Sequence, residues 1–257
     1  MELNGLVTFR SGTSAQGLIA EWPGLARLDC SRDGTRFQVT AHGGAGPQAL
    51  QKLRGFIRVL LSERRGSLGL HAAAACLGSR AVLILGDSGA GKSTAAAELC
   101  LRYGGKLLAD DAACLRMTRG SAYVQRTERL HFLSDESCVG LRLSSSRRVP
   151  NAAKQLIPAV RAASRSCRLG LVAFLRFDDS VAETTCRAVH GYEAVLLLLR
   201  SVLRFDVEDK VARQRELDQL VLICEQSSVI EIVRRRHEPQ VGAILVRKLK
   251  ACAGEDE

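Results

Sequence analysis

Residues 86–93, with the sequence GDSGAGKS, constrain the fold of this chain more than any other feature. The segment matches the pattern G-x-x-x-x-G-K-[ST], which binds phosphate where a strand precedes it and a helix follows it. Both flanks fit this requirement. The apolar run 81–85 predicts a strand buried on both faces, and residues 93–102 predict a helix that stops at Gly104-Gly105. We therefore expect a strand–loop–helix unit that binds a nucleoside triphosphate.

Each residue type in this loop has a chemical reason. Glycine lets the backbone turn tightly and present its N–H groups to phosphate oxygens, next to the positive end of the helix dipole. We expect Lys92 to neutralise the terminal phosphates and the hydroxyl of Ser93 to ligate Mg²⁺. The predicted nucleotide-binding residues are Gly86, Asp87, Ser88, Gly89, Ala90, Gly91, Lys92, Ser93 and Thr94.

Two carboxylates, Asp110 and Asp111, follow the predicted strand Lys106–Ala109. Open α/β sheets bind ligands at the carboxyl ends of their strands, so we expect this pair beside the phosphates. One carboxylate would hold Mg²⁺ while the other takes a proton from an attacking hydroxyl, and the sequence leaves open which does which. The alternative is an ordinary acidic strand end, as at Asp178-Asp179. His71, ahead of the loop's strand, is either a structural residue or a third catalytic candidate.

These residues carry a family resemblance. His71, the glycine-rich loop, the helical triplet Ala97-Glu98-Leu99 and the run 107–111 (LLADD) resemble the catalytic core of bacterial HPr kinase/phosphorylase. That family is distantly similar in core to ATP-dependent phosphoenolpyruvate carboxykinase. The resemblance is strong over about residues 68–118 and weaker from there to the C-terminus.

The resemblance implies an α/β fold with a mixed central sheet carrying the loop, of the HPr kinase and phosphoenolpyruvate carboxykinase C-terminal type. It implies ATP and Mg²⁺ as ligands, His71 near the transferred phosphoryl group, and Lys92, Ser93, Asp110 and Asp111 in the roles given above. Some short members sit in lasso-peptide clusters and phosphorylate a serine of the precursor peptide. The expected reaction is therefore phosphoryl transfer to a hydroxyl of a peptide, protein or small molecule, most of all a peptide or protein serine.

Two departures from the family pattern bear on activity. The family often has Glu directly after the loop serine, where this chain has Thr94, and its basic, glycine-containing C-terminal segment is not found here. Both put the reverse phosphorylase activity, and HPr as substrate, in question. A nucleotide-binding regulatory protein without transfer activity is the main alternative. A plain nucleoside triphosphatase is a third. Such an enzyme usually needs a separate apolar strand ending in Asp that binds the metal, and residues 171–178 could be mistaken for one.

A small β-rich N-terminal portion, residues 1–66, is predicted to precede a kinase-like domain at 67–257. Its strands 26–30 and 35–40 flank a hairpin turn, and a helix follows Pro47. The segment Arg126-Thr127-Glu128-Arg129-Leu130 resembles an arginine-containing strand of the short family members. Arg129 or Arg168 is a candidate for stabilising the moving phosphoryl group. Towards the C-terminus the sequence predicts strands at 169–177 and 229–233 and helices at 193–203, 207–224 and 239–249.

Charge and cysteine content bear on the partners and the cellular location of the protein. The net charge is +10, but apart from Arg234-Arg235-Arg236 the basic residues are dispersed, which disfavours a nucleic-acid partner. Nine cysteines without a C-x-x-C pair predict reduced, mostly buried thiols in a cytoplasmic protein without a cysteine metal site. The apolar run 196–199 is far too short to cross a bilayer. Full-length relatives form oligomers, so the resemblance adds a homo-oligomer to these expectations, and no motif distinguishes ATP from GTP.

Overall fold

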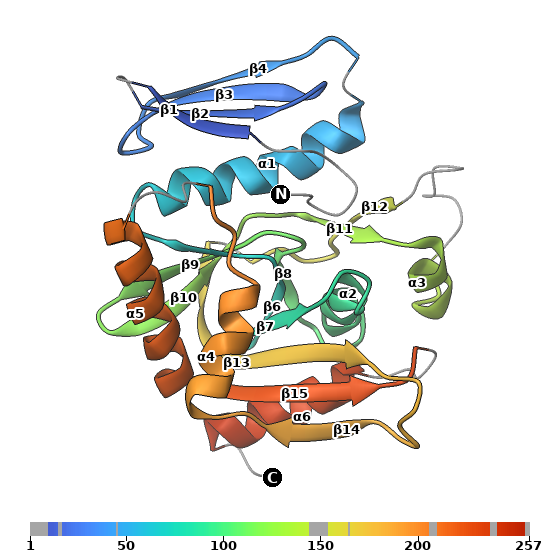
Figure 1. Ribbon diagram of the computed structural model, residues 1–257. Helices are drawn as coiled ribbons and strands as arrows, with labels where there is room; N and C mark the ends of the chain where they lie inside the picture. The colour runs from blue at the N-terminus through green and yellow to red at the C-terminus, as the bar shows by residue number, and fades with distance from the viewer. Residues whose placement is uncertain are drawn as a thin grey trace.

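The computed structural model describes residues 10–14, 17–44, 46–143, 154–163, 165–205, 210–236 and 241–254. It is a mixed α/β structure with a nine-stranded sheet, a separate four-stranded sheet at the N-terminal end and a short two-stranded sheet (Figure 1). The mixed central sheet and the small β-rich N-terminal portion agree with the sequence prediction.

The central sheet contains parallel and antiparallel neighbours. Its strands are β5 (Leu68–Leu70), β6 (Ala73–Leu77), β7 (Arg80–Gly86), β8 (Lys106–Ala109), β9 (Ala113–Thr118), β10 (Ser121–Gln125), β13 (Ser166–Phe177), β14 (Thr185–Ala188) and β15 (Ser228–Arg234). The strand order is β5-β9-β10-β13-β7-β6-β8. β13 pairs with β10 through its first residues and with β15 through its second half, and β14 closes that edge.

Four strands of this sheet have their carboxyl ends at the same edge. β13 is parallel to both β7 and β15. β6 is antiparallel to both β7 and β8, so β8 runs in the same direction as β7. The carboxyl ends of β7, β8, β13 and β15 therefore meet at the edge where the amino end of β6 begins. Open α/β sheets bind ligands at such an edge.

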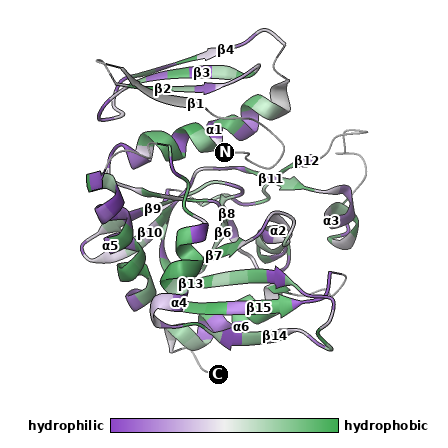
Figure 2. Cartoon of the chain, viewed as in Figure 1, coloured by the Kyte–Doolittle hydropathy of each residue, from purple (hydrophilic) through white to green (hydrophobic). Residues whose placement is uncertain are grey.

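Helices cover both faces of the sheet, which is why its inner strands are apolar throughout. On β7, Val82 and Ile84 pack against the helices of one face, while Leu83 and Leu85 pack against those of the other. Hydrophobic colouring runs along these inner strands in Figure 2. The first face carries α2 (Lys92–Arg102) and α6 (Val241–Ala253), and the second carries α4 (Gly191–Arg200) and α5 (Lys210–Gln226).

The N-terminal sheet packs on the amphipathic helix α1 (Pro47–Glu63), which in turn packs against the central sheet (Figure 1). Its strands are β1 (Arg10–Ser14), β2 (Gly17–Trp22), β3 (Ala26–Ser31) and β4 (Phe37–Ala41). Trp22 and Leu28 of the sheet share one apolar cluster with Leu60 of α1 and with Cys114 of β9. The helix after Pro47 and the hairpin before it are confirmed. The division between residues 66 and 67 stays a prediction.

Several elements differ from the sequence prediction. The polar stretch after β11 (Leu130–Leu133), which had no assignment, contains α3 (Asp135–Gly140) and β12 (Gln155–Pro158). β14 was not predicted, because its short segment Thr185–Ala188 is exposed and lacks an apolar pattern. The helix predicted to reach residue 203 ends at Arg200. The predicted starts of the last two helices, at 207 and 239, lie outside the described residues.

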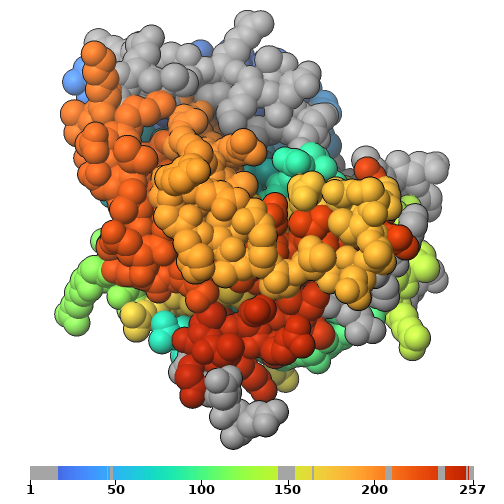
Figure 3. All heavy atoms as spheres, turned by 60° about the horizontal axis from the view of Figure 1, so that its bottom comes forward, coloured from blue at the N-terminus to red at the C-terminus, as the bar shows by residue number. Residues whose placement is uncertain are grey.

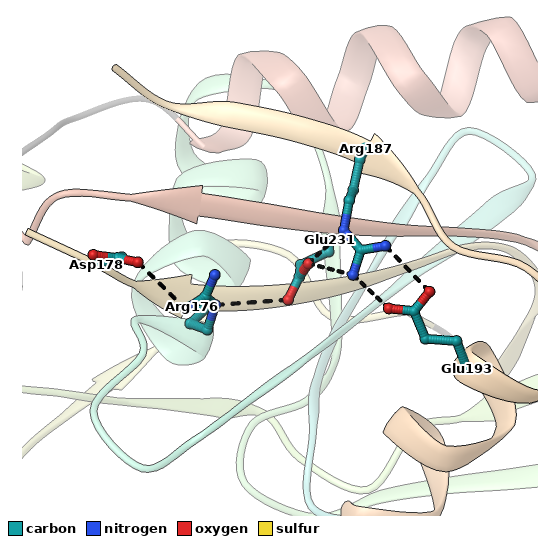
Figure 4. Close-up of polar contacts among 5 residues, drawn as sticks. All are labelled: Arg176, Asp178, Arg187, Glu193 and Glu231. Carbon is teal, nitrogen blue, oxygen red and sulfur yellow. Dashed lines mark hydrogen bonds and ion pairs between the residues drawn. The ribbon is translucent and has the colours of Figure 1, made fainter. Parts of the chain in front are cut away.

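An ion-pair network holds the sheet edge formed by β14 (Figure 4). Glu231 of β15 forms ion pairs with Arg187 of β14 at 2.7 Å and with Arg176 of β13 at 3.7 Å. Arg187 also contacts Glu193 in the first turn of α4. Neighbouring carboxylates raise the pKa of the Arg187 guanidinium. The space-filling view shows β14 and α4, in yellow to orange, covering this side of the molecule (Figure 3).

Cys76 of β6 and Cys167 of β13 form a disulfide, with their Cα atoms 6.1 Å apart. The expectation of reduced thiols throughout is wrong for this pair. Strand pairing around β7 brings the two residues into one apolar cluster although 91 positions separate them, which no local pattern reveals. Seven other cysteines are free, four of them buried. Among the described residues, no helix combines the length and apolarity that crossing a membrane requires.

Candidate functional site

The glycine-rich loop joins the carboxyl end of β7 to the amino end of α2. Gly86, Gly89 and Gly91 have φ angles of 139°, 83° and 90°, which side-chain-bearing residues rarely adopt. Gly86 also lies against β13, because a Cβ at this position would come within 2.3 Å of the carbonyl oxygen of Leu175. The loop conformation therefore requires glycine at these positions.

Gly86→Ala should lower the free energy of unfolding by about 2 kcal/mol or more, since the methyl group meets a strand carbonyl and the φ angle is unfavourable. Gly89→Ala is the matched control. Its added Cβ meets no atom within 4 Å, so only the backbone strain of about 1 kcal/mol remains. Urea unfolding of the two variants measures the difference. Equal losses would show that the close approach to Leu175 carries no energetic weight.

Lys92 begins α2 and lies beneath the loop. Its Nζ donates to the carbonyl oxygens of Gly86 at 2.8 Å and Asp87 at 3.0 Å, and the residue is 7% exposed. Burial lowers the pKa of its ammonium group, and the charges of Asp111 and Asp110 act in the opposite direction. The loop tip, residues 87–89, is exposed, whereas Ala90 is buried.

Ser93 and Thr94, in the first turn of α2, have different neighbours. The Ser93 hydroxyl lies close to the carboxyl group of Asp110 and acts to lower its pKa. The Thr94 hydroxyl lies 2.7 Å from that of Ser137 in α3. The two consecutive side chains thus point to opposite sides of the helix start, one towards the acidic pair and one towards α3.

Asp110 follows β8 and is 1% exposed. Its Oδ2 accepts a hydrogen bond from the backbone N–H of Phe132 at 2.7 Å, while its Oδ1 has no hydrogen-bond partner among the described residues. Burial and the neighbouring charge of Asp111 raise the pKa of this carboxyl to about 7, and the Ser93 hydroxyl partly offsets them. A buried carboxylate oxygen without a partner, beside a serine hydroxyl, is the donor set that a hard divalent cation prefers.

Asp111 lies in an unusual backbone conformation, with φ at 98°. Its Oδ2 is 3.0 Å from the Nζ of Lys52 in α1, and both side chains are nearly buried. Burial alone would raise the pKa of Asp111, but Lys52, Lys154 and His71 hold it below its ordinary value. The environment thus moves the pKa values of the two adjacent carboxyl groups in opposite directions. Asp111 stays ionised, while Asp110 titrates near neutral pH.

His71 lies between β5 and β6. Its Nδ1 is 2.9 Å from the backbone oxygen of Asp111, which can only accept, so Nδ1 carries the proton of the neutral ring. Burial and the charge of Lys92 lower the pKa of His71. The histidine therefore helps to hold the strained Asp111 backbone.

The structure brings together Lys92, Ser93, Asp110, Asp111 and His71, and each of them acts on the pKa of at least one of the others or contacts it directly. It adds three ionisable groups that the sequence did not indicate: Lys52, Lys154 and Glu128. Glu128 is 2% exposed, and burial raises its pKa to about 8. The segment 126–130 was singled out for its arginines, and its buried acid carried no local signal. Lys52 lies on an amphipathic helix whose spacing predicts only packing.

Of the two arginines proposed from the sequence, Arg168 lies away from the loop. Arg168 is aligned with Arg80 at the start of β7, at the end of the sheet away from the loop. Arg129 is exposed, before β11. Arg234, at the end of β15, lies beside the loop instead, since its Nη2 is 2.6 Å from where a Cβ of Gly91 would be. Its guanidinium also stacks over the ring of Phe177 at 4.6 Å.

The residues present fit a magnesium ion shared with phosphates. Among the described residues, no group of three or more His, Cys, Asp or Glu side chains could hold a metal by itself. Mg²⁺ in nucleotide sites needs fewer protein ligands, usually one or two, because phosphate oxygens and water complete its shell. Ser93 and the unpartnered oxygen of Asp110 meet that need.

No protein-family model and no curated protein matches this chain. Among solved structures, one similar chain is titled as the HPr(Ser) kinase/phosphatase from Coxiella burnetii. It is 13% identical, the similar region covers 72% of this chain and 98% of that one, and the TM-score is 0.41. Such a low TM-score does not establish a common fold, so the function proposed below depends on the geometry of the site.

Proposed function

We propose that this chain is an ATP-dependent phosphotransferase that moves the terminal phosphoryl group of Mg·ATP to a hydroxyl, most of all a serine of a peptide or protein. The observation that supports this function is one arrangement. A buried ammonium group lies under a glycine-rich loop, and the serine that follows it lies close to one member of a buried carboxyl pair. Phosphoryl transfer depends almost wholly on positioning and charge, and these groups supply both.

The positions of the residues assign a different role to each of them. The loop and Lys92 bind the phosphates, which draw the ammonium group away from the carbonyls of Gly86 and Asp87. Ser93 and Asp110 hold Mg²⁺, which neutralises charge on the phosphate oxygens when it is bound. Asp111 accepts the hydrogen bond of the acceptor hydroxyl, and Lys52 and His71 keep its carboxylate in place. The acceptor oxygen bonds to the γ-phosphorus as the bond to ADP breaks, and the hydroxyl proton passes to Asp111.

The central test uses ATP labelled on its γ-phosphate, with Mg²⁺ and serine-containing peptides from the same gene neighbourhood. We expect label on the peptide, and a loss of about 10²-fold or more with Lys92→Met or Asp111→Asn. Lys106→Met and Asp218→Asn are matched controls, because both side chains are exposed, Lys106 at the start of β8 and Asp218 on α5. Transfer that survives Lys92→Met unchanged would overturn the proposed function.

The main alternative is a regulator that binds nucleotide without transferring phosphate. The ion pair between Lys52 and Asp111 favours it, because this pair engages the carboxylate that transfer requires. The same assay separates the two functions. A regulator binds ATP tightly, labels no acceptor and releases no phosphate, whereas a plain triphosphatase releases phosphate without labelling an acceptor.

A further inference from the structure

A cavity of about 380 Å³ adjoins the glycine-rich loop, and neither Asp110 nor Asp111 is among its lining residues. Gly89 and Gly91 of the loop, Thr94 and Glu98 of α2, and Phe177 at the end of β13 contribute to its wall. α3 closes the opposite side through Ser134 and Ser137. The volume lies in the range of small-molecule sites.

The order of the strands places this cavity relative to the phosphates. The spatial order of the strands is β8-β6-β7-β13, and β15 is next to β13. The acidic pair follows β8, on one side of the loop. Phe177 and Arg234 are the last residues of β13 and β15, on the other side. Ser93 faces the acidic pair, and its neighbour Thr94 lines the cavity. A polyphosphate that reaches from Asp110 across the start of α2 therefore ends at the cavity.

The chemistry of the wall suits an uncharged nucleoside rather than an anion. The ring of Phe177 has the guanidinium of Arg234 at 4.6 Å and that of Arg236 at 5.5 Å, a flat surface on which a base can stack. Arg234 lies next to Gly91, where it would contact the inner phosphates of a bound nucleotide.

Glu98, farther along α2, is nearly buried and accepts bonds from the backbone of Gly242 at 2.9 Å and from Arg102 at 3.3 Å. A carboxylate in the wall repels a phosphate but accepts hydrogen bonds from sugar hydroxyls or base amino groups. The hydroxyls of Thr94 and Ser137 add donors and acceptors.

We infer that this cavity binds the nucleoside half of the nucleotide, with the base stacked at Phe177 and Arg234. The inference rests on the proposed function only in that the loop holds the phosphates. It makes the cavity the part of the site that distinguishes a nucleotide from an inorganic polyphosphate.

The experiment compares binding of Mg·ATP, Mg·ADP and magnesium tripolyphosphate by titration calorimetry. Phe177→Ala should lower the affinity for ATP and ADP about tenfold or more, because one base–aromatic stack is lost. The affinity for tripolyphosphate should not change. Ser137→Leu should do the same by filling the cavity from α3. Tyr192→Ala removes an aromatic ring that is 82% exposed on α4 and is the control. Urea unfolding checks that each variant is folded.

The outcomes separate this inference from the proposed function. If nucleotides bind in a Phe177-dependent manner but no acceptor is phosphorylated, the nucleoside cavity stands and the transferase function fails. If both cavity variants bind ATP and tripolyphosphate with equally reduced affinity, or if neither affinity falls, the inference is overturned even where transfer is observed. Loss of all three ligands in Lys92→Met is expected in either case.

Discussion

Asp110→Asn should make the protein more stable at neutral pH and at the same time abolish phosphoryl transfer. Burial and the charge of Asp111 raise the pKa of Asp110 from 3.8 to about 7 in the folded protein. Ionisation of this side chain therefore costs folding free energy above neutral pH, on the order of 4 kcal/mol. Asparagine is the same shape, still accepts the bond from Phe132, and cannot ionise. Transfer is lost because the amide is a poor ligand for Mg²⁺.

The pH dependence of this gain follows from the direction of the shift. The folded pKa is above the unfolded one, so the folded state binds the proton more tightly, and that stabilisation is complete below the unfolded pKa and is lost as the pH rises towards 7. The advantage of the variant is thus absent below about pH 4, grows between about pH 4 and 7, and is constant above. Urea unfolding at pH 3.5, 5.5 and 8 measures it.

Asp178→Asn is the control of opposite sign. Bonds from Ser180 lower the pKa of Asp178, so its ionised form is favoured in the folded state and the substitution should bring no gain. A variant at Asp110 that is less stable than the parent at pH 8 would contradict the buried, protonated carboxyl described above. Retained transfer would show instead that Asp110 is not part of the reaction.

The second large effect is expected at Lys52. Lys52→Met should lower the free energy of unfolding by about 3 to 5 kcal/mol, because it leaves the carboxylate of Asp111 buried without its partner. Met keeps the length and the apolar stem, so the packing of Lys52 near the ring of Phe132 is largely preserved. Denaturant unfolding without ligand measures the loss.

A double variant separates the charge effect from packing. Lys52→Met with Asp111→Asn removes both charges and should recover most of the stability that the single variant loses. Mg·ATP should also restore part of the stability of Lys52→Met, since the metal supplies positive charge near the acidic pair. If the double variant is as unstable as Lys52→Met alone, the lysine acts through packing, and its ion pair with Asp111 has no energetic role.

The local chemistry of the site was accessible from the sequence because its parts are contiguous. Glycines at 86, 89 and 91 specify a loop with positive φ angles, and the apolar run before them specifies a strand buried on both faces. The pair Asp110-Asp111 directly follows a strand, and its place at the same sheet edge needed only the direction of β8. Each of these inferences uses residues a few positions apart, whose spacing reflects a local backbone geometry.

The surroundings of the site were decided by tertiary structure alone. Lys52 comes from a helix of the N-terminal portion, Glu128 from the turn before β11, and Arg234 from the end of the last strand. Their spacing along the chain carries no signal, because long-range strand pairing and helix packing bring them to the loop. The pKa values of Asp110 and Asp111 diverge for the same reason. Sequence determined which groups could bind a phosphate, and packing decided which charges and which cavity face them, since burial and distance exist only in the folded chain.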